Sequence, residues 1–247
     1  MSSTVPRETR TISYGDDPAQ FAELTLPEGT PQGVVVVVHG GFWRAAYDVS
    51  LGRPLATSLA EHGWAAWNVE YRRVGNGGGS PTTFDDVAAA VDALLGQGLP
   101  LDRVIALGHS AGGHLATWAA SRGRFPRWPA KVTLTGVVSQ AGVLDLEAAY
   151  DAGLGSGAVA NFLGHRPGPE DAPLDPRRQV ALDVPVHCIH GTLDDSVPLS
   201  QSEEYVAAAR AAGGAAELTV VEGGDHFVLI DPTSEPWQRT LAILDGL

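Results

Sequence analysis

The sequence predicts an α/β fold with a mostly parallel, doubly wound sheet that has helices on both faces. The segment "VVVVV" at residues 34–38 is apolar at every position, which is typical of an inner strand buried on both sides. Further short apolar segments alternate with helical patterns along the chain, as in parallel sheets joined by right-handed crossovers. Because such sheets bind ligands at the carboxyl ends of their strands, we expect the functional residues in the loops that follow.

Each element has its own signal in the sequence. Residues 9–13 and 21–26 flank the turn-rich "GDDP" and predict an antiparallel hairpin at one edge of the sheet. Strands are then expected at residues 34–38, 64–69, 103–107, 132–138, 184–189 and 217–221. Helices are expected at residues 48–62, at 83–95, directly after "GHSAGG", in the alanine-rich segment before the last strand, and at 237–244.

The length of 247 residues and the apolar content of 44% suit one core, so we expect a single domain over residues 1–247. Residues 145–180, called the cap segment below, interrupt the alternation with glycines, prolines and only short helical pieces. The segment lies between two strands at their carboxyl ends, where it is expected to form a small cap over the site. The alternative is an ordinary crossover helix with irregular flanks.

Composition limits the classes of partner. The 29 acidic and 16 basic residues give a formal charge of −13 with no basic block, which argues against nucleic acid or an anionic membrane as partner. Cys188 is the single cysteine, so no intramolecular disulfide forms. Residues 1–10 lack the apolar core of a signal peptide, and no segment approaches the roughly 20 apolar residues of a membrane span. We expect a soluble cytoplasmic protein, with a homodimer left open.

The pentapeptide Gly108-His109-Ser110-Ala111-Gly112 matches the G-x-S-x-G pattern and falls between a predicted strand and a predicted helix. This pattern makes a tight turn that holds the serine in a strained conformation with its hydroxyl exposed. We therefore predict that Ser110 is a nucleophile. The alternative is a serine that only caps the following helix.

A serine nucleophile needs a base and a group that orients the base. In this type of fold the acid and then the histidine follow the serine along the chain. "HGTLDDSVP" offers Asp194 and, as the alternative, Asp195, while "GGDHF" after the last strand offers His226. We predict Asp194 and His226, with Phe227 anchoring its loop on the core; the alternative for His226 is an exposed loop residue. A dehalogenase would need a carboxylate where Ser110 stands.

Acyl transfer also needs backbone N–H groups that stabilise the developing oxyanion. One donor is the residue after the nucleophile, Ala111, and the others are expected in "HGGFW" after the valine strand. Glycine allows the backbone to approach a ligand closely there. We predict Gly41 and Phe42 as the main donors of this loop and Gly40 as the third.

Together, "HGGFW", "GHSAGG", "HGTLDDSVP" and "GDHF" resemble the serine hydrolases of the α/β-hydrolase superfamily, over nearly the whole chain. They are similar to esterases of the hormone-sensitive-lipase type and, through H-G-G-x-W, to kynurenine formamidases and prolyl-oligopeptidase-like hydrolases. The resemblance implies an α/β-hydrolase fold with a catalytic triad. Phe42 replaces the third glycine of the esterase motif and is expected to narrow the mouth of the site. Because 33 residues precede the valine strand, we expect no amino-terminal domain like that of the related peptidases.

The expected activity is hydrolysis of small ester or arylformamide bonds through an acyl-enzyme, without cofactor or metal, because no histidine and carboxylate cluster has metal-ligand spacing. Alternatives are a small peptidase and a non-catalytic small-molecule receptor on the same fold. Phe42, Trp43 and Tyr47 are predicted to contact the substrate, although such aromatics equally pack in a core. Arg72 and Arg73 are expected to form structural salt bridges; the alternative is that one of them binds a substrate carboxylate.

Overall fold

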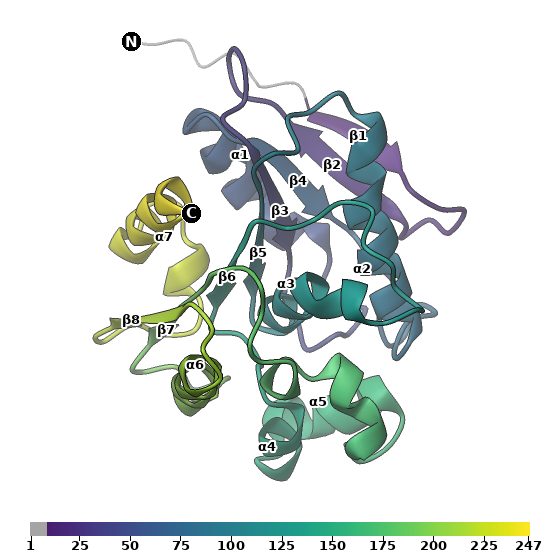
Figure 1. Ribbon diagram of the computed structural model, residues 1–247, viewed down its shortest axis with the longest axis vertical. Helices are drawn as coiled ribbons and strands as arrows, with labels where there is room; N and C mark the ends of the chain where they lie inside the picture. Colours follow the sequence, from purple (N-terminus) through teal and green to yellow (C-terminus); the bar gives the residue numbers. More distant parts are fainter. Residues whose placement is uncertain (1–8) are drawn as a thin grey trace.

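An eight-stranded sheet forms the centre of the computed structural model, which describes residues 9–247 (Figure 1). The strands are β1 (Thr9–Ser13), β2 (Phe21–Thr25), β3 (Val34–Val38), β4 (Ala65–Val69), β5 (Val104–His109), β6 (Gly136–Gln140), β7 (Val186–Gly191) and β8 (Ala216–Val221). Their order in the sheet is β1-β2-β4-β3-β5-β6-β7-β8. The pairs β1–β2 and β2–β4 are antiparallel and all others are parallel, which confirms the predicted sheet and its amino-terminal hairpin.

Helices cover both faces of the sheet. The α-helices are α1 (Arg53–Glu61), α2 (Thr82–Asp92), α3 (Ala111–Ser121), α4 (Leu146–Asp151), α5 (Leu154–Leu163), α6 (Ser200–Ala211) and α7 (Glu235–Gly246). Figure 1 shows α1 and α7 together on one side of the strands and α2 and α3 on the other. Short 3-10 helices span Val49–Gly52, Ala93–Gly96, Arg122–Arg124, Pro169–Leu174, Pro176–Arg178 and Val228–Ile230.

The valine strand β3 contributes to two separate cores. Val34, Val36 and Val38 pack in the core that includes α2 and α3, whereas Val35 and Val37 pack in the core beneath α1 and α7. All five side chains are buried because successive residues of a strand point to opposite faces. The uninterrupted valine run is therefore explained by helices on both sides, as the sequence predicted.

Two elements differ from expectation by more than a few residues at their start. The strand predicted at residues 132–138 is β6 at Gly136–Gln140, because pairing with β5 begins only where Gly136 lies opposite Ile105. Val132 and Leu134 gave a strand-like pattern since they are buried, but they belong to the preceding connection. The helix predicted at residues 48–62 is a 3-10 turn followed by α1. The expectation that residues 1–10 hold no signal peptide concerns mainly residues 1–8, which lie outside the described residues.

The cap segment folds as α4, α5 and two short 3-10 helices, below the main sheet in Figure 1. Phe162 of α5 stacks on Trp43, with ring centroids 4.6 Å apart, so this segment packs directly on the loop after β3. Gly155, Ser156 and Gly157 all have positive φ, which turns the chain sharply at the start of α5.

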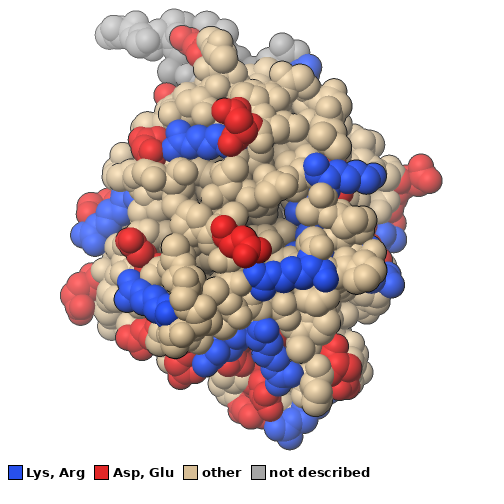
Figure 2. Space-filling view, in the orientation of Figure 1, with Lys and Arg blue, Asp and Glu red and all other residues tan. Residues whose placement is uncertain are grey.

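Charged side chains are mixed over the surface. On the face in Figure 2, acidic and basic residues lie near one another and neither sign gathers into one large area. Ion pairs such as Arg127–Asp85 and Arg178–Glu147 contribute to this mixing. Within residues 9–247, the helices are all too short or too polar to cross a membrane.

Candidate active site

Ser110 lies in the turn between β5 and α3, with φ 57° and ψ −121°. This is a strained conformation for a residue with a side chain. Its side chain makes no hydrogen bond to the start of α3, so the helix-cap alternative is wrong.

The two glycines of the pentapeptide are required by close backbone contacts. A Cβ atom on Gly108 would lie 2.0 Å from the carbonyl oxygen of Gly112, and one on Gly112 would lie 2.0 Å from the carbonyl oxygen of Val38. The turn is therefore pressed against its own backbone on one side and against the end of β3 on the other. The G-x-S-x-G pattern thus follows directly from the space available.

Asp194 and His226 form a short hydrogen bond. His226 Nδ1 donates to Asp194 Oδ2 at 2.6 Å, and Asp194 Oδ1 accepts from the amides of Ser196 and Val197 at 2.9 and 2.8 Å. Asp195 accepts only from the Ser196 hydroxyl, at 3.1 Å, among the described contacts. The geometry therefore links His226 to Asp194 and not to the alternative, Asp195.

A second histidine lies against the same carboxylate. His190 Nε2 donates to the Val197 carbonyl at 2.9 Å and lies 3.3 Å from Asp194 Oδ2, while its Nδ1 lies 2.8 Å from the Ser202 hydroxyl. Burial by itself would raise the pKa of Asp194, but contacts with His190 and His226 outweigh burial and hold this pKa well below its usual range. Asp194 is therefore a carboxylate at neutral pH.

His109 connects the serine turn to the His226 loop. Its Nε2 donates to the backbone carbonyl of His226 at 2.8 Å, and the two rings lie 4.4 Å apart. Burial lowers the pKa of His109 to about 3, so it stays neutral. Ser110 and His226 are only 2% and 4% exposed, which describes a closed site at the carboxyl edge of the sheet.

Phe227 does not anchor its loop. Its side chain is 61% exposed, so the predicted contact with the core is wrong. The loop is held instead by backbone and polar contacts, among them the His109 bond and two amide bonds to Asp225.

The loop after β3 lies close to the serine turn. A Cβ on Gly40 would meet the carbonyl oxygen of His109 at 2.8 Å and the Cβ of Ser110 at 3.0 Å. Gly41 and Phe42 follow with φ of 111° and 52°. Within residues 9–247, the amides of Gly40, Gly41, Phe42 and Ala111 donate to no protein acceptor, so the predicted oxyanion donors are free to bind a ligand.

The predicted substrate-binding aromatics separate into two groups. Trp43 is fully buried, and its indole N–H donates to His114 Nδ1 at 3.2 Å, so its side chain has the packing role left open above. Phe42 packs against Gly155, where a Cβ would lie 2.5 Å from the phenyl ring. Tyr47 is 44% exposed beside Gly41 and is the member of this set on the rim.

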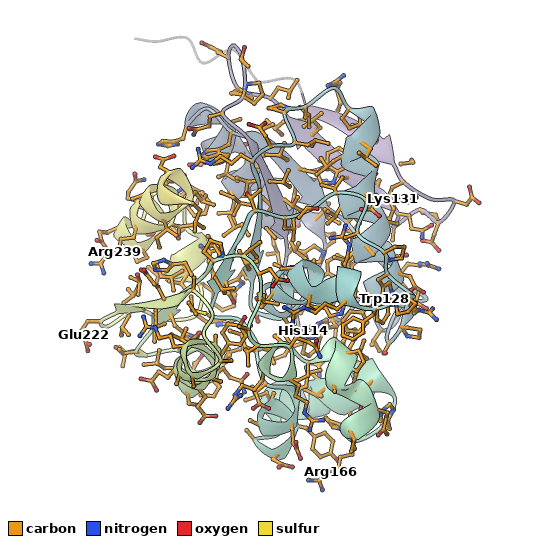
Figure 3. All side chains as sticks on the ribbon, in the orientation of Figure 1. His114, Trp128, Lys131, Arg166, Glu222 and Arg239 are labelled. Atoms are coloured by element: carbon orange, nitrogen blue, oxygen red, sulfur yellow. The ribbon has the colours of Figure 1, made fainter. Side chains whose placement is uncertain are left out.

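His114 joins three parts of the site. It lies in the interior between α3 and the cap segment (Figure 3), accepts from Trp43 and donates through Nε2 to the Leu174 carbonyl at 2.8 Å. Burial lowers its pKa to about 4, so the ring is neutral with its proton on Nε2. The loop after β3, helix α3 and the cap segment therefore share one buried polar contact.

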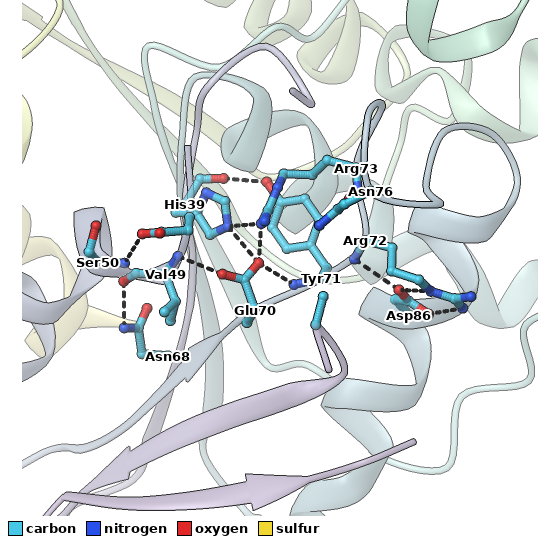
Figure 4. A network of polar contacts seen from close by, with 12 residues as sticks. His39, Val49, Ser50, Asn68, Glu70, Tyr71, Arg72, Arg73, Asn76 and Asp86 are labelled. Atoms are coloured by element: carbon cyan, nitrogen blue, oxygen red, sulfur yellow. Dashed lines mark hydrogen bonds and ion pairs between the residues drawn. The ribbon is translucent and has the colours of Figure 1, made fainter. Parts of the chain in front are cut away.

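Both arginines after β4 form structural ion pairs (Figure 4). Arg72 makes a bidentate pair with Asp86 at 2.9 and 2.7 Å, and Arg73 pairs with Glu70 in the interior. Both guanidinium groups are engaged by carboxylates of the chain, so the predicted salt bridges are confirmed.

One cluster in the cap segment contradicts the expectation that no histidine and carboxylate group has metal-ligand spacing. The ligand atoms of His165, Glu170 and Asp171 all lie within 4.8 Å of one another. His165 Nε2 lies 3.0 Å from Asp171 Oδ2, which also accepts from the Gly168 amide. These hydrogen bonds account for the pairing of His165 with Asp171.

Sequence reasoning missed the polar groups that support the site from behind. No role was assigned from the sequence to His190, Tyr71, Glu70 or His114. Each stands within four residues of a motif residue or at the end of an inner strand, but its partner comes from a distant segment. The adjacent polar run "EYRR" after a buried strand was the one usable signal.

Comparison with known proteins agrees with this architecture. The model of the prolyl oligopeptidase family matches residues 62–244. A rice (Oryza sativa subsp. japonica) protein named "Probable isoprenylcysteine alpha-carbonyl methylesterase" is 28% identical over 243 residues, and the match covers 88% of this chain and 57% of that protein. The corresponding methylesterase of Arabidopsis thaliana is 27% identical, with 90% and 58% covered. The chain thus spans a little over half the length of these curated relatives.

Solved structures resemble the chain over almost its full length. A truncated carbohydrate esterase from gut microbiota has a TM-score of 0.81 at 20% identity and covers 97% of this chain and 95% of that chain. Esterase 2 of Thermogutta terrifontis, phosphonylated by sarin, has a TM-score of 0.78 at 20% identity, with 99% and 95% covered. Likeness at this identity establishes the fold, whereas the family match covers most of the sequence. The chain therefore belongs to the prolyl oligopeptidase family and has the α/β-hydrolase fold.

Proposed function

We propose that this protein is a serine hydrolase that cleaves small esters through an acyl-enzyme, with Ser110 as nucleophile, His226 as general base and acid, and Asp194 orienting His226. The observation that best supports the proposal is the 2.6 Å bond between His226 and Asp194, in a loop that His109 ties to the strained serine turn. A strained, glycine-flanked serine and a histidine oriented by a carboxylate are the components that nucleophilic acyl transfer requires.

In the first half of the reaction, Ser110 Oγ attacks the ester carbonyl carbon while His226 Nε2 takes the hydroxyl proton. The negative charge on the carbonyl oxygen is stabilised by the free amides of Ala111 and of the loop that carries Gly40, Gly41 and Phe42. The bond to the leaving alcohol then breaks, and the alcohol takes the proton from His226. Water repeats the sequence on the acyl-enzyme and releases the acid and free Ser110.

The closed surroundings of Ser110 favour compact acyl groups. Ser110 is almost inaccessible, Phe42 packs against Gly155, and Phe162 closes over Trp43. A long acyl chain needs an extended apolar groove, worth about 0.8 kcal/mol for each buried methylene. We therefore expect turnover to fall as the acyl chain lengthens.

The test uses the purified protein with p-nitrophenyl esters from acetate to palmitate, together with a fluorophosphonate probe. We expect covalent labelling of the wild type, none of Ser110→Ala, and the highest rate with acetate or butyrate. A Ser110→Ala variant with near-normal turnover contradicts the nucleophile assignment. A folded wild type that resists labelling favours the receptor alternative, and a rate maximum at ten carbons or longer contradicts the compact acyl site.

The same purified protein can be tested against three narrower classes of substrate. Methyl esters are suggested by the methylesterase relatives, arylformamides by the H-G-G-x-W motif, and peptides by the family to which the chain belongs. We propose small carboxylic esters or arylformamides first. Turnover of N-formylkynurenine assigns the arylformamidase type, and cleavage of a short proline-containing peptide at a higher kcat/KM than any ester assigns the peptidase.

A further inference from the structure

We propose that Tyr71 and His39 are positioning residues that preset the oxyanion loop, an assignment that rests on the proposed function. They hold two successive carbonyl groups at the start of this loop. Tyr71 Oη donates to the His39 carbonyl at 2.7 Å, and His39 Nδ1 donates to the Gly40 carbonyl at 2.8 Å. Neither side chain reaches a reacting atom; each acts through the backbone that it holds.

Peptide planarity transmits these bonds to the donors. The carbonyl of one residue and the N–H of the next lie in one rigid plane and point in opposite directions. Fixing the His39 carbonyl therefore fixes the direction of the Gly40 N–H, and fixing the Gly40 carbonyl fixes that of the Gly41 N–H. Both amides are free of protein acceptors within the described part of the chain. Glycine has no side chain to restrain its torsions, so the restraint must come from outside the loop.

The orientation of His39 is itself determined by its neighbours (Figure 4). Arg73 Nη1 lies 3.0 Å and Glu70 Oε1 lies 3.5 Å from His39 Nε2, so both partners of the buried ion pair contact this edge of the ring. The opposite edge faces the loop, where Nδ1 donates to the Gly40 carbonyl. The ring of His39 is thus oriented by the Arg73–Glu70 pair.

Arg73 is held by a buried carboxylate. Glu70 Oε1 pairs with Arg73 and accepts from the Tyr71 amide at 2.8 Å, while Oε2 accepts from the Val49 amide at 2.9 Å. His39, Glu70, Tyr71 and Arg73 are all buried, and the His39 and Tyr71 rings stack at 4.5 Å. The network therefore ties the ends of β3 and β4 and the turn before α1 into one rigid support.

A positioning role of Tyr71 differs from a purely structural role in a measurable way. An oxyanion hole accelerates the reaction only if its donors point correctly before the charge develops. Loss of the Tyr71 hydroxyl should therefore reduce kcat and the affinity for analogues that carry an oxyanion, while KM stays nearly unchanged. A hydroxyl that only contributes to packing would lower stability and leave these ratios alone.

The experiment compares Tyr71→Phe with Tyr205→Phe, which removes the hydroxyl of another buried tyrosine, one that has no hydrogen-bond partner in the structure. For Tyr71→Phe we expect kcat on p-nitrophenyl acetate to fall about 10- to 100-fold, and binding of a trifluoromethyl ketone to weaken by the same factor. The Tyr205→Phe control should match the wild type. In a second pair, His39→Asn keeps a donor near the Nδ1 position and should retain more activity than His39→Leu.

Amide NMR of glycine-labelled protein gives a readout that needs no turnover. We expect the Gly40 and Gly41 amide signals to shift and broaden in Tyr71→Phe and to stay unchanged in Tyr205→Phe. Unchanged amide signals together with kcat within twofold of the wild type overturn the positioning role. If the wild type hydrolyses no ester but its amides respond as expected, the proposed function fails and the positioning of the loop stands.

Discussion

Replacing Gly112 by alanine should push the start of α3 away from the end of β3. The new Cβ would lie 2.0 Å from the Val38 carbonyl oxygen and 2.6 Å from that of His39, both backbone atoms that cannot rotate away. Carbon and oxygen in contact normally stay about 3.3 Å apart or more. The start of α3 and the end of β3 must therefore move apart by roughly 1 Å if the chain folds at all.

The expected cost has two components. Inserting a methyl group into a packed interior typically destabilises a protein by about 1–3 kcal/mol. A displacement of about 1 Å between reacting groups costs on the order of 100-fold in rate. Gly112→Ala should therefore lower kcat on p-nitrophenyl acetate about 100-fold in the fraction that remains folded.

Stability is measured by urea unfolding, and kcat is measured by steady-state kinetics on the folded protein without urea. Gly96→Ala serves as the control, because a Cβ at Gly96 meets no atom within 4 Å and its φ is not positive. We expect this control to keep the activity and the unfolding midpoint of the wild type. Gly112→Ala with kcat within threefold of the wild type and an unchanged midpoint would refute the contact that explains the second glycine of the motif.

Three further predictions follow from individual side chains. Asp194→Asn should reduce kcat by about 10⁴-fold through loss of the correct His226 tautomer, whereas Asp195→Asn should leave kcat unchanged; equal effects would contradict the assignment. Burial and the nearby Asp145 raise the pKa of Asp175 to about 7, so the folded chain keeps a proton that the unfolded chain releases near pH 4. The stabilisation from this bound proton is complete below about pH 4 and is lost as the pH rises to about 7. Asp175→Asn should remove up to about 4 kcal/mol of this decline in the free energy of unfolding. The urea midpoint of the variant should therefore depend less on pH than that of the wild type. Phe227→Ala should change the free energy of unfolding by less than about 0.5 kcal/mol, because the ring is exposed; a loss above 2 kcal/mol in urea unfolding would show that it anchors the loop after all.

The features that could be predicted from sequence are those determined by local backbone geometry. Five consecutive valines require burial on both faces of a strand, and the glycines beside Ser110 are required by contacts at 2.0 Å. Ser110, Asp194 and His226 each follow a parallel strand, and because these strands end at the same edge of the sheet their loops lie together. In these cases the residue type and its near neighbours carry the constraint, so one sequence is enough.

The features that were missed depend on partners far apart in the chain. The start of β6 is set by its pairing with β5. The apolar Val132 and Leu134 in the connection led to a predicted start that is too early. Phe227 looks like an anchor in the sequence because phenylalanine is usually buried, but the polar bonds of its loop make that contact unnecessary. Packing of this kind is decided in three dimensions.

The buried polar groups of the site share one arrangement, and its partners lie outside the sequence motifs. Two backbone carbonyls of the site are each held by a buried histidine that a remote side chain contacts. His39 holds the Gly40 carbonyl and is contacted by Arg73, and His114 holds the Leu174 carbonyl and is contacted by Trp43. Burial lowers the pKa of His114 to about 4, and a neutral ring avoids the cost of burying a charge while it still offers a directed donor. Below about pH 4, protonation of His114 would place a positive ring against the Trp43 N–H, so this support should fail as the pH falls.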